Sequence, residues 1–195
     1  MNRAPALLHA AARGELPAWA RADEPRRRHM AGVAALLNEW ASALALPDPD
    51  RERWRAAAWL HDSLRTAPRG ELLPLVPPEF RDLPARVLHG PAAAARLRAD
   101  GVVDEPLLLA IAHHTLGHPD FDVLGQALYA ADFLEPGRTF DPLLRATMRA
   151  RMPAAMGDIV PEIVRLRLIH LLRSGRRIRP ETLAFWNALA KRDHG

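Results

Sequence analysis

The spacing of apolar residues is the feature that most constrains how this chain can fold. Along most of its 195 residues, apolar side chains recur every three or four positions, whereas alternating and β-branched stretches are scarce. Such spacing places side chains on one face of an α-helix. Val33, Leu36, Leu37 and Trp40 form one of these stripes. The pattern predicts an all-α protein, and the length is typical of a single domain.

Turn residues separate the expected helices. We expect helices over residues 6–21, 25–44, 51–64, 84–88, 91–100, 105–115, 123–134, 142–152, 158–174 and 180–192. Asp48-Pro49-Asp50 is interpreted as the turn and N-cap before the third helix. Residues 66–82 contain four prolines and a glycine. This composition predicts a long loop, of the kind that often contacts ligands.

The composition excludes several kinds of site. The chain has no cysteine, so disulfides and thiolate-bound metals are ruled out. A metal would be held by His, Asp or Glu, which suit Fe, Mn, Mg or Zn. No apolar run has the length needed to cross a bilayer, and residues 1–16 lack the apolar core of a signal peptide. We therefore expect a cytoplasmic protein.

Arginine dominates the basic residues. Lys191 is the only lysine, so 26 of the 27 basic residues are arginines, and the net charge is only +4. The high pKa of arginine inflates a calculated isoelectric point, so the value of about 10.7 does not indicate an extremely basic surface. Some arginines could bind phosphate, which the planar guanidinium matches. Because most are interleaved with Asp and Glu, we do not expect a nucleic-acid-binding protein.

Imidazole and carboxylate side chains fall on the inward faces of several expected helices. They are His29, His61, Asp62, His89, His114 and Asp132. Taken singly, such a histidine is more often a hydrogen-bonded core residue, and such an aspartate is more often a helix cap. Taken together, with no basic residue expected on the same faces, they predict a metal site. A buried carboxylate is costly unless it is paired or binds a metal.

The order of these residues, and three longer motifs, resemble a known family. The order is similar to that of the HD superfamily of metal-dependent phosphohydrolases, with His61-Asp62 as the HD pair. The sequences AIAHHTLG (110–117) and YAADFLEPGR (129–138), and IRPET (178–182) followed by Asn187, resemble motifs of its YqeK branch. The resemblance implies a single HD-type helical bundle over residues 1–195. We expect an N-terminal helix in 1–24, a metal-binding core in 25–138 and C-terminal helices in 139–195.

The resemblance also implies an activity and a set of metal ligands. The YqeK branch hydrolyses diadenosine tetraphosphate symmetrically, giving two ADP, at a di-iron centre. By similarity, one metal would be held by His29, His61, Asp62 and Asp132. The second would be held by His89 and His114, with Asp62 as the bridge. Iron is the expected metal, with manganese as the alternative.

Four further residues are expected at the substrate: Arg65, Thr115, Gly117 and Arg138. Arg65 stands where the branch usually has a lysine, and we assign it, with Asp62, to catalysis. Arg138 is expected to contact phosphate or, alternatively, to form a salt bridge with Glu135 or Asp141. Thr115 and Gly117 are expected to shape the pocket wall, although a glycine that ends a helix is the other interpretation of Gly117.

The other histidines receive no ligand role. His113 is expected beside the centre or at the surface, and His118 in a solvated loop. His9, His170 and His194 belong to no matching motif. His89 is expected at a helix end, just before Gly90-Pro91.

Two other functions stay open within this resemblance. The protein could hydrolyse other nucleotides by the same chemistry. It could also be a metal-containing nucleotide sensor with little turnover, which only the replacement of the lysine by Arg65 favours. Either function is compatible with a homodimer.

Overall fold

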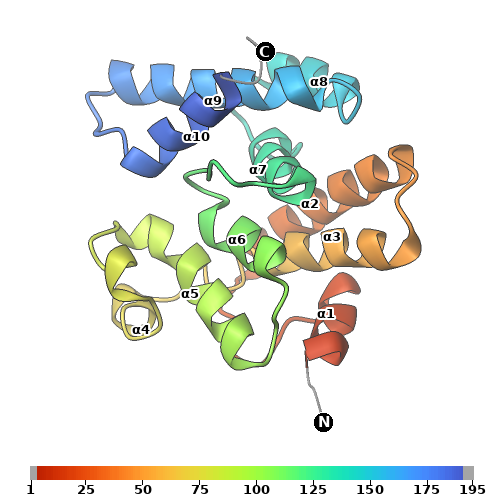
Figure 1. The fold of residues 1–195 in the computed structure, drawn as a ribbon, viewed down its shortest axis with the longest axis vertical. Helices are drawn as coiled ribbons and strands as arrows, with labels where there is room; N and C mark the ends of the chain where they lie inside the picture. The colour runs from red at the N-terminus through yellow and green to blue at the C-terminus, as the bar shows by residue number, and fades with distance from the viewer. Residues whose placement is uncertain (1–3, 191–195) are drawn as a thin grey trace.

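Every regular element of the protein is helical in the part of the chain that the computed structural model describes, residues 4–190 (Figure 1). The elements are α1 (Ala4–Ala12), α2 (Glu24–Ala43), α3 (Asp48–Leu60), α4 (Arg69–Leu72), the 3-10 helix η1 (Pro78–Phe80), α5 (Ala85–Ala99), α6 (Glu105–His113), α7 (Val123–Leu134), α8 (Pro142–Arg151), α9 (Met156–Arg173) and α10 (Pro180–Ala190). The predicted all-α fold is confirmed. None of the described helices is both long enough and apolar enough to cross a membrane.

Helix α7 lies at the centre of the molecule. It packs against α2, α3 and α6 on one side and against α8 and α9 on the other (Figure 1). Nine of its twelve residues are buried, as expected for a helix with neighbours around most of its circumference. Asp132, on the last turn of α7, is therefore carried into the interior.

Small residues let α5 and α6 pack closely. A Cβ atom at Gly90 of α5 would lie 2.8 Å from the carbonyl oxygens of both Ile111 and Ala112. Only glycine fits this distance, because a backbone carbonyl cannot move aside cheaply. The close approach brings His89, next to Gly90 on α5, toward His114 at the end of α6.

Aspartates fix the starts of the helices that carry the predicted ligands. Asp23, Asp104 and Asp122 are the N-caps of α2, α6 and α7, and each accepts a hydrogen bond from a backbone N–H in the first turn. These bonds satisfy donors that a helix start leaves without partners. The caps therefore fix where His29, His114 and Asp132 fall along their helices.

The C-terminal helices hold the end of α7. Two arginines of α8 donate to its last carbonyl groups: Arg145 Nη1 to the oxygen of Phe133, and Arg149 Nη1 to that of Leu134 at 2.6 Å. Carbonyl groups at a helix C-terminus have no partner within the helix and favour cations. Helix α8 therefore stabilises the turn of α7 that carries Asp132.

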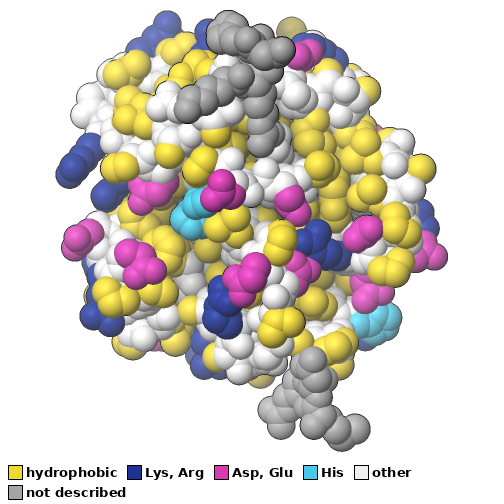
Figure 2. All heavy atoms as spheres, viewed as in Figure 1, with side chains coloured by type: hydrophobic (Ala, Val, Ile, Leu, Met, Phe, Trp, Pro, Cys, Tyr) yellow, Lys and Arg dark blue, Asp and Glu magenta, His cyan; other side chains and the backbone are white. Residues whose placement is uncertain are grey.

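The surface mixes charges of both signs. Figure 2 shows basic side chains interspersed with acidic ones and with apolar ones on the face that it presents. No single basic area covers this face, in keeping with the interleaved sequence pattern.

Several predicted helix ends are wrong. Helix α1 ends at Ala12 rather than at Arg21, because Gly14 adopts a left-handed conformation with φ of 86°. Helix α3 begins at Asp48, with Pro47 as N-cap, and ends at Leu60 rather than at Leu64. Asp48 is therefore the first helical residue and not the cap.

Two predicted breaks are also wrong. The expected loop 66–82 contains α4 and η1. The expected interruption at Gly90-Pro91 is absent, since α5 runs through it with Pro91 inside the helix. Buried residues on both sides of Pro91, among them Leu88 and Ala92, keep the helix continuous despite the missing N–H. The last helix is described to Ala190, so residues 191 and 192 of its predicted range lie outside the described part.

Candidate metal centre

All six predicted ligand side chains converge on one buried volume. They come from α2 (His29), the turn after α3 (His61 and Asp62), α5 (His89), the end of α6 (His114) and α7 (Asp132). Their exposed fractions range from 0% for His61 to 9% for His29. His89 is inside α5 and not at a helix end as predicted, but it still points inward.

The two oxygens of Asp62 face different pairs of histidines. Oδ2 lies 3.5 Å from His61 Nε2 and 3.8 Å from His29 Nε2. Oδ1 lies 2.8 Å from His89 Nε2 and 3.5 Å from His114 Nε2. One carboxylate thus stands between two groups of imidazole nitrogens.

Two groups of donor atoms are compact enough to hold a cation. In each group the donor atoms all lie within 4.8 Å of one another: His29, His61 and Asp132 in one, and His61, Asp62 and His114 in the other. In the first group, His29 Nε2 lies 3.0 Å from Asp132 Oδ1. In the second, His114 Nε2 also lies 3.1 Å from His89 Nε2.

The backbone orients two of the imidazole rings. His61 Nδ1 lies 2.7 Å from the carbonyl oxygen of Ala58, and His114 Nδ1 lies 2.8 Å from that of Ile111. A carbonyl oxygen only accepts, so Nδ1 carries the hydrogen and the Nε2 lone pair faces the centre. His61 Nε2 is buried and has no hydrogen-bond partner among the described residues. A buried nitrogen without a partner, beside two carboxylates, fits a metal ligand.

The protonation states also suit metal binding. Burial raises the pKa of Asp62, but the neighbouring imidazoles of His61, His114 and His89 hold this pKa well below its usual value. Burial likewise opposes ionisation of Asp132, yet His29 and Arg138 keep its pKa well below the usual range. Burial lowers the pKa of His89 to about 4. At neutral pH the site therefore contains two carboxylates and a neutral His89 ring.

Arginines reach the same carboxylates, contrary to the expectation that no basic residue shares these faces. Arg26 Nη1 lies 2.7 Å from Asp62 Oδ2. Arg138 pairs with Asp132, and not with Glu135 or Asp141, the alternative to a phosphate contact; its Nη2 lies 3.3 Å from His29 Nε2. Both arginines are long enough to reach the site from its edge, so their own positions do not fall on the apolar stripes.

A pocket of about 280 Å³ opens beside the centre. His29 lines it together with three arginines: Arg26, Arg65 and Arg138. Asp23, Pro25, Thr66, Glu135 and Gly137 complete the lining. Planar guanidinium groups around a concave surface are suited to the oxygens of a phosphate chain.

The profile of the HD domain family matches residues 26–137, a range that contains all six converging side chains. The chain belongs to the HD domain family.

Relatives of this HD-domain protein carry one name. A protein of Halalkalibacterium halodurans is 28% identical over 172 residues, which cover 85% of this chain and 89% of that protein. One of Bacillus subtilis is 27% identical over 174 residues, covering 85% of this chain and 90% of its own. Both are named bis(5'-nucleosyl)-tetraphosphatase, symmetrical.

A solved structure shares the fold. It is described as a predicted HD superfamily hydrolase involved in NAD metabolism from Clostridium acetobutylicum. The two chains align with a TM-score of 0.76 at 24% identity, covering 87% of this chain and 90% of the other. The HD-type helical bundle is therefore confirmed.

Thr115 and Gly117, both expected to shape the pocket wall, are not among the residues that line the arginine-rich pocket. Thr115 Oγ1 lies 3.1 Å from His114 Nε2, so it adjoins the centre without lining the arginine-rich pocket. Gly117 packs against Phe185, where a Cβ atom would lie 2.1 Å from Cδ1, and its φ is 83°. This contact with α10 and the left-handed backbone explain why residue 117 is a glycine.

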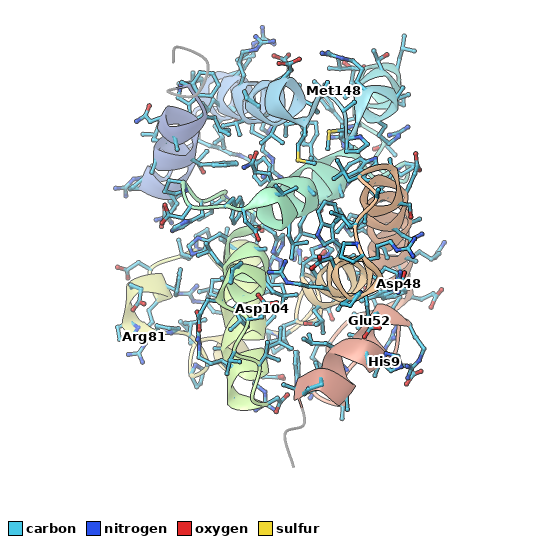
Figure 3. The ribbon with its side chains drawn as sticks, turned by 45° about the vertical axis from the view of Figure 1, so that its right-hand side comes forward. His9, Asp48, Glu52, Arg81, Asp104 and Met148 are labelled. Carbon is cyan, nitrogen blue, oxygen red and sulfur yellow. The ribbon has the colours of Figure 1, made fainter. Side chains whose placement is uncertain are left out.

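The remaining histidines lie away from the centre. His113 lines a second, more apolar pocket of about 710 Å³ between α5 and α6, and its ring packs against His118. His9 of α1 pairs with Glu52 of α3, Nδ1 to Oε1 at 3.0 Å (Figure 3). His170 is exposed, and His194 lies outside the described residues.

Three residues near the centre were not predicted from the sequence. Arg26 belongs to the Arg26-Arg27-Arg28 run just before His29, and Glu135 lies within the motif at 129–138. Arg167 of α9 donates to the carbonyl oxygen of Thr115 at 2.6 Å, and its Nη2 lies 3.9 Å from Asp132 Oδ2. The proximity of Arg26 and Glu135 to quoted motifs was a usable signal, whereas nothing in the sequence connects Arg167 to Asp132.

Proposed function

We propose that this HD-domain protein is a phosphohydrolase that cleaves bis(5'-nucleosyl) tetraphosphates symmetrically, converting diadenosine tetraphosphate and water into two ADP. The observation that carries the proposal is the placement of Asp62 between two pairs of imidazole nitrogens, next to a pocket lined by three arginines. The names of the two relatives that match most of the chain support the choice of substrate.

We assign two cations to the centre. His29, His61, Asp62 and Asp132 would hold one, and His89, His114 and the shared Asp62 would hold the other. Mixed imidazole and carboxylate donors suit iron, with manganese as the alternative. Bound cations of this kind acidify water to a nucleophile at neutral pH and neutralise charge on phosphoryl oxygens.

Symmetrical cleavage defines what the protein residues have to do. Water attacks one of the two central phosphorus atoms, the bridging P–O bond between them breaks, and each half leaves as ADP. Arg65 and Arg138, with Arg26 beside them, would bind oxygens of the phosphate chain and hold the central bridge at the centre. A guanidinium group does not readily release a proton, so the role of Arg65 would be to stabilise negative charge rather than to transfer a proton.

The test combines metal analysis with identification of products. Protein purified without chelator or oxygen should contain iron or manganese and convert diadenosine tetraphosphate to ADP alone. Formation of ATP and AMP would contradict symmetrical cleavage. Binding of the nucleotide with no product, in the presence of added iron or manganese, would instead favour the sensor function, and a panel of other nucleotides would test the broader hydrolase function.

A substitution tests the centre directly. Asp62→Ala should remove both the metal and the hydrolysis while the helical content, measured by circular dichroism, stays close to that of the wild type. A metal-loaded and fully active Asp62→Ala protein would refute the proposal. Light scattering of the same samples would show whether the protein is a monomer or a homodimer.

A further inference from the structure

We infer that Glu135 is a positioning residue that holds the ring of His29, so that the Nε2 atom of His29 faces the metal centre. The inference rests on the proposed role of His29 as a metal ligand. Glu135 follows α7 directly, and its side chain contacts α2, the helix that carries His29.

The contact between the two side chains is direct and buried. His29 Nδ1 lies 3.0 Å from Glu135 Oε2, and the two residues are 9% and 7% exposed. A carboxylate accepts hydrogen bonds, so Nδ1 is the donor. The opposite ring atom, Nε2, then points at Asp132 Oδ1, 3.0 Å away.

Two glycines leave the space that the Glu135 carboxylate occupies. A Cβ atom at Gly32 would lie 2.6 Å from Glu135 Oε1, and one at Gly137 would lie 2.9 Å from the same oxygen. The N–H of Gly137 also donates to Oε1 at 2.7 Å. One carboxylate oxygen is therefore held by the backbone, while the other is left to His29.

The other rings of the centre show that this contact is specific to His29. His61 and His114 are oriented by carbonyl oxygens of their own helical segments, Ala58 and Ile111. For His29 the acceptor is a charged side chain 106 residues away in the sequence. Such a carboxylate fixes the ring and makes its free nitrogen a stronger donor to a metal.

The experiment measures Zn²⁺ affinity by competition with a chelator and the ring signals of histidine by ¹⁵N NMR of the Zn²⁺-loaded protein. Glu135→Leu should weaken Zn²⁺ binding about 10- to 100-fold, the usual effect of losing such a partner. Glu135→Gln keeps an acceptor oxygen without the charge and should weaken binding less. Gly32→Ala should resemble Glu135→Leu, because the added methyl group displaces the carboxylate.

The NMR signals separate positioning from general damage. In the Glu135 variants the Nδ1–H signal of His29 should shift or disappear, while those of His61 and His114 stay unchanged. Glu39→Gln is the matched control, because it removes the charge of an exposed glutamate on α2, the helix that carries His29. It should alter neither the Zn²⁺ affinity nor the histidine signals. Should Glu135→Leu fail to fold, Glu135→Gln and Gly32→Ala still test the inference.

Two results would overturn the inference, and they have different meanings. If the wild type binds Zn²⁺ and all three test variants keep its affinity and its His29 signal, Glu135 does not position His29, and the metal centre stands. If the wild type binds neither Zn²⁺, iron nor manganese, the proposed function fails, and the inference fails with it.

Discussion

Arg53 of α3 and Asp104, the N-cap of α6, form a two-point ion pair, with Nε–Oδ2 at 2.5 Å and Nη2–Oδ1 at 2.8 Å. Asp104 also accepts a hydrogen bond from the backbone N–H of Leu107. Asp104 is labelled in Figure 3. The pair fixes the start of α6, which His114 follows, to α3, which His61 and Asp62 follow.

This pair should make stability depend on pH. Burial raises the pKa of Asp104, but the hydrogen bonds from Arg53 and Leu107 lower this pKa by more than burial raises it. The net shift is therefore downward. A lowered pKa means that the folded state binds the proton less readily than the unfolded state does. The stabilisation is therefore complete above about pH 4, the usual aspartate value, and is lost as the pH falls through the lowered pKa.

Asp104→Asn tests the effect, because asparagine keeps the helix cap and removes the charge. We expect a loss of about 1–2 kcal/mol at pH 7, and a shrinking difference from the wild type as the pH falls below about 4. Urea unfolding across this pH range measures it. A difference that stays constant with pH would contradict the assignment.

Gly90→Ala should disturb the centre through the backbone. The new methyl group would lie 2.8 Å from two carbonyl oxygens of α6 and 3.2 Å from His114 Cε1. We expect a loss of about 1–3 kcal/mol in unfolding free energy and weaker metal binding, as His89 and His114 move apart. Gly70→Ala, with no atom within 4 Å of its new Cβ, is the control. Wild-type stability in Gly90→Ala would show that α5 and α6 can separate freely.

Removing the metals should destabilise the protein. Ligands from five separate segments bind together only in the folded state, so a metal present at 100 times its dissociation constant adds about 2.7 kcal/mol to the unfolding free energy. A chelator should therefore lower the melting temperature of the wild type. It should have no effect on Asp62→Ala, which lacks the carboxylate that we assign to both cations. An equal effect on both proteins would mean that the chelator acts elsewhere.

Arg65→Ala should lower kcat/KM for diadenosine tetraphosphate by about 100-fold, a typical effect of losing one charge-stabilising donor at a reacting centre. Metal content should not change, because Arg65 lines the pocket and is not one of the converging donors. Arg65→Lys should recover most of the activity, since a cation returns to the site. Arg86→Ala, at an exposed position on α5, is the control. Loss of metal in Arg65→Ala would assign this residue a structural role.

The inward-facing residues were predictable because the helical stripe determines which side of a helix is buried. His29, His114 and Asp132 each extend such a stripe, and the structure places each of them at the centre. Helical spacing gave no indication of Arg26, and Arg138 was expected at the substrate on other grounds. Their long side chains reach the carboxylates from the edge of the site, and this reach depends on tertiary contacts rather than on spacing.

Local propensity also failed where packing decides the conformation. Gly90-Pro91 is a strong signal for a helix break, yet α5 continues through it because the residues on both sides are buried. For Glu135, by contrast, no local signal indicates its contact. In the sequence it is one residue of the motif at 129–138, and its contact with His29 emerges only when α2 packs against the end of α7.

The family match ends at residue 137, but the hydrogen bonding of α7 does not end there. The carbonyl groups that follow Asp132 are capped by Arg145 and Arg149, beyond that boundary. A fragment cut at the edge of the matched region would expose these groups to water and free the last turn of α7. The matched region and the hydrogen bonding thus divide this chain differently, because α8 supplies no ligand and yet bonds directly to the helix that carries Asp132.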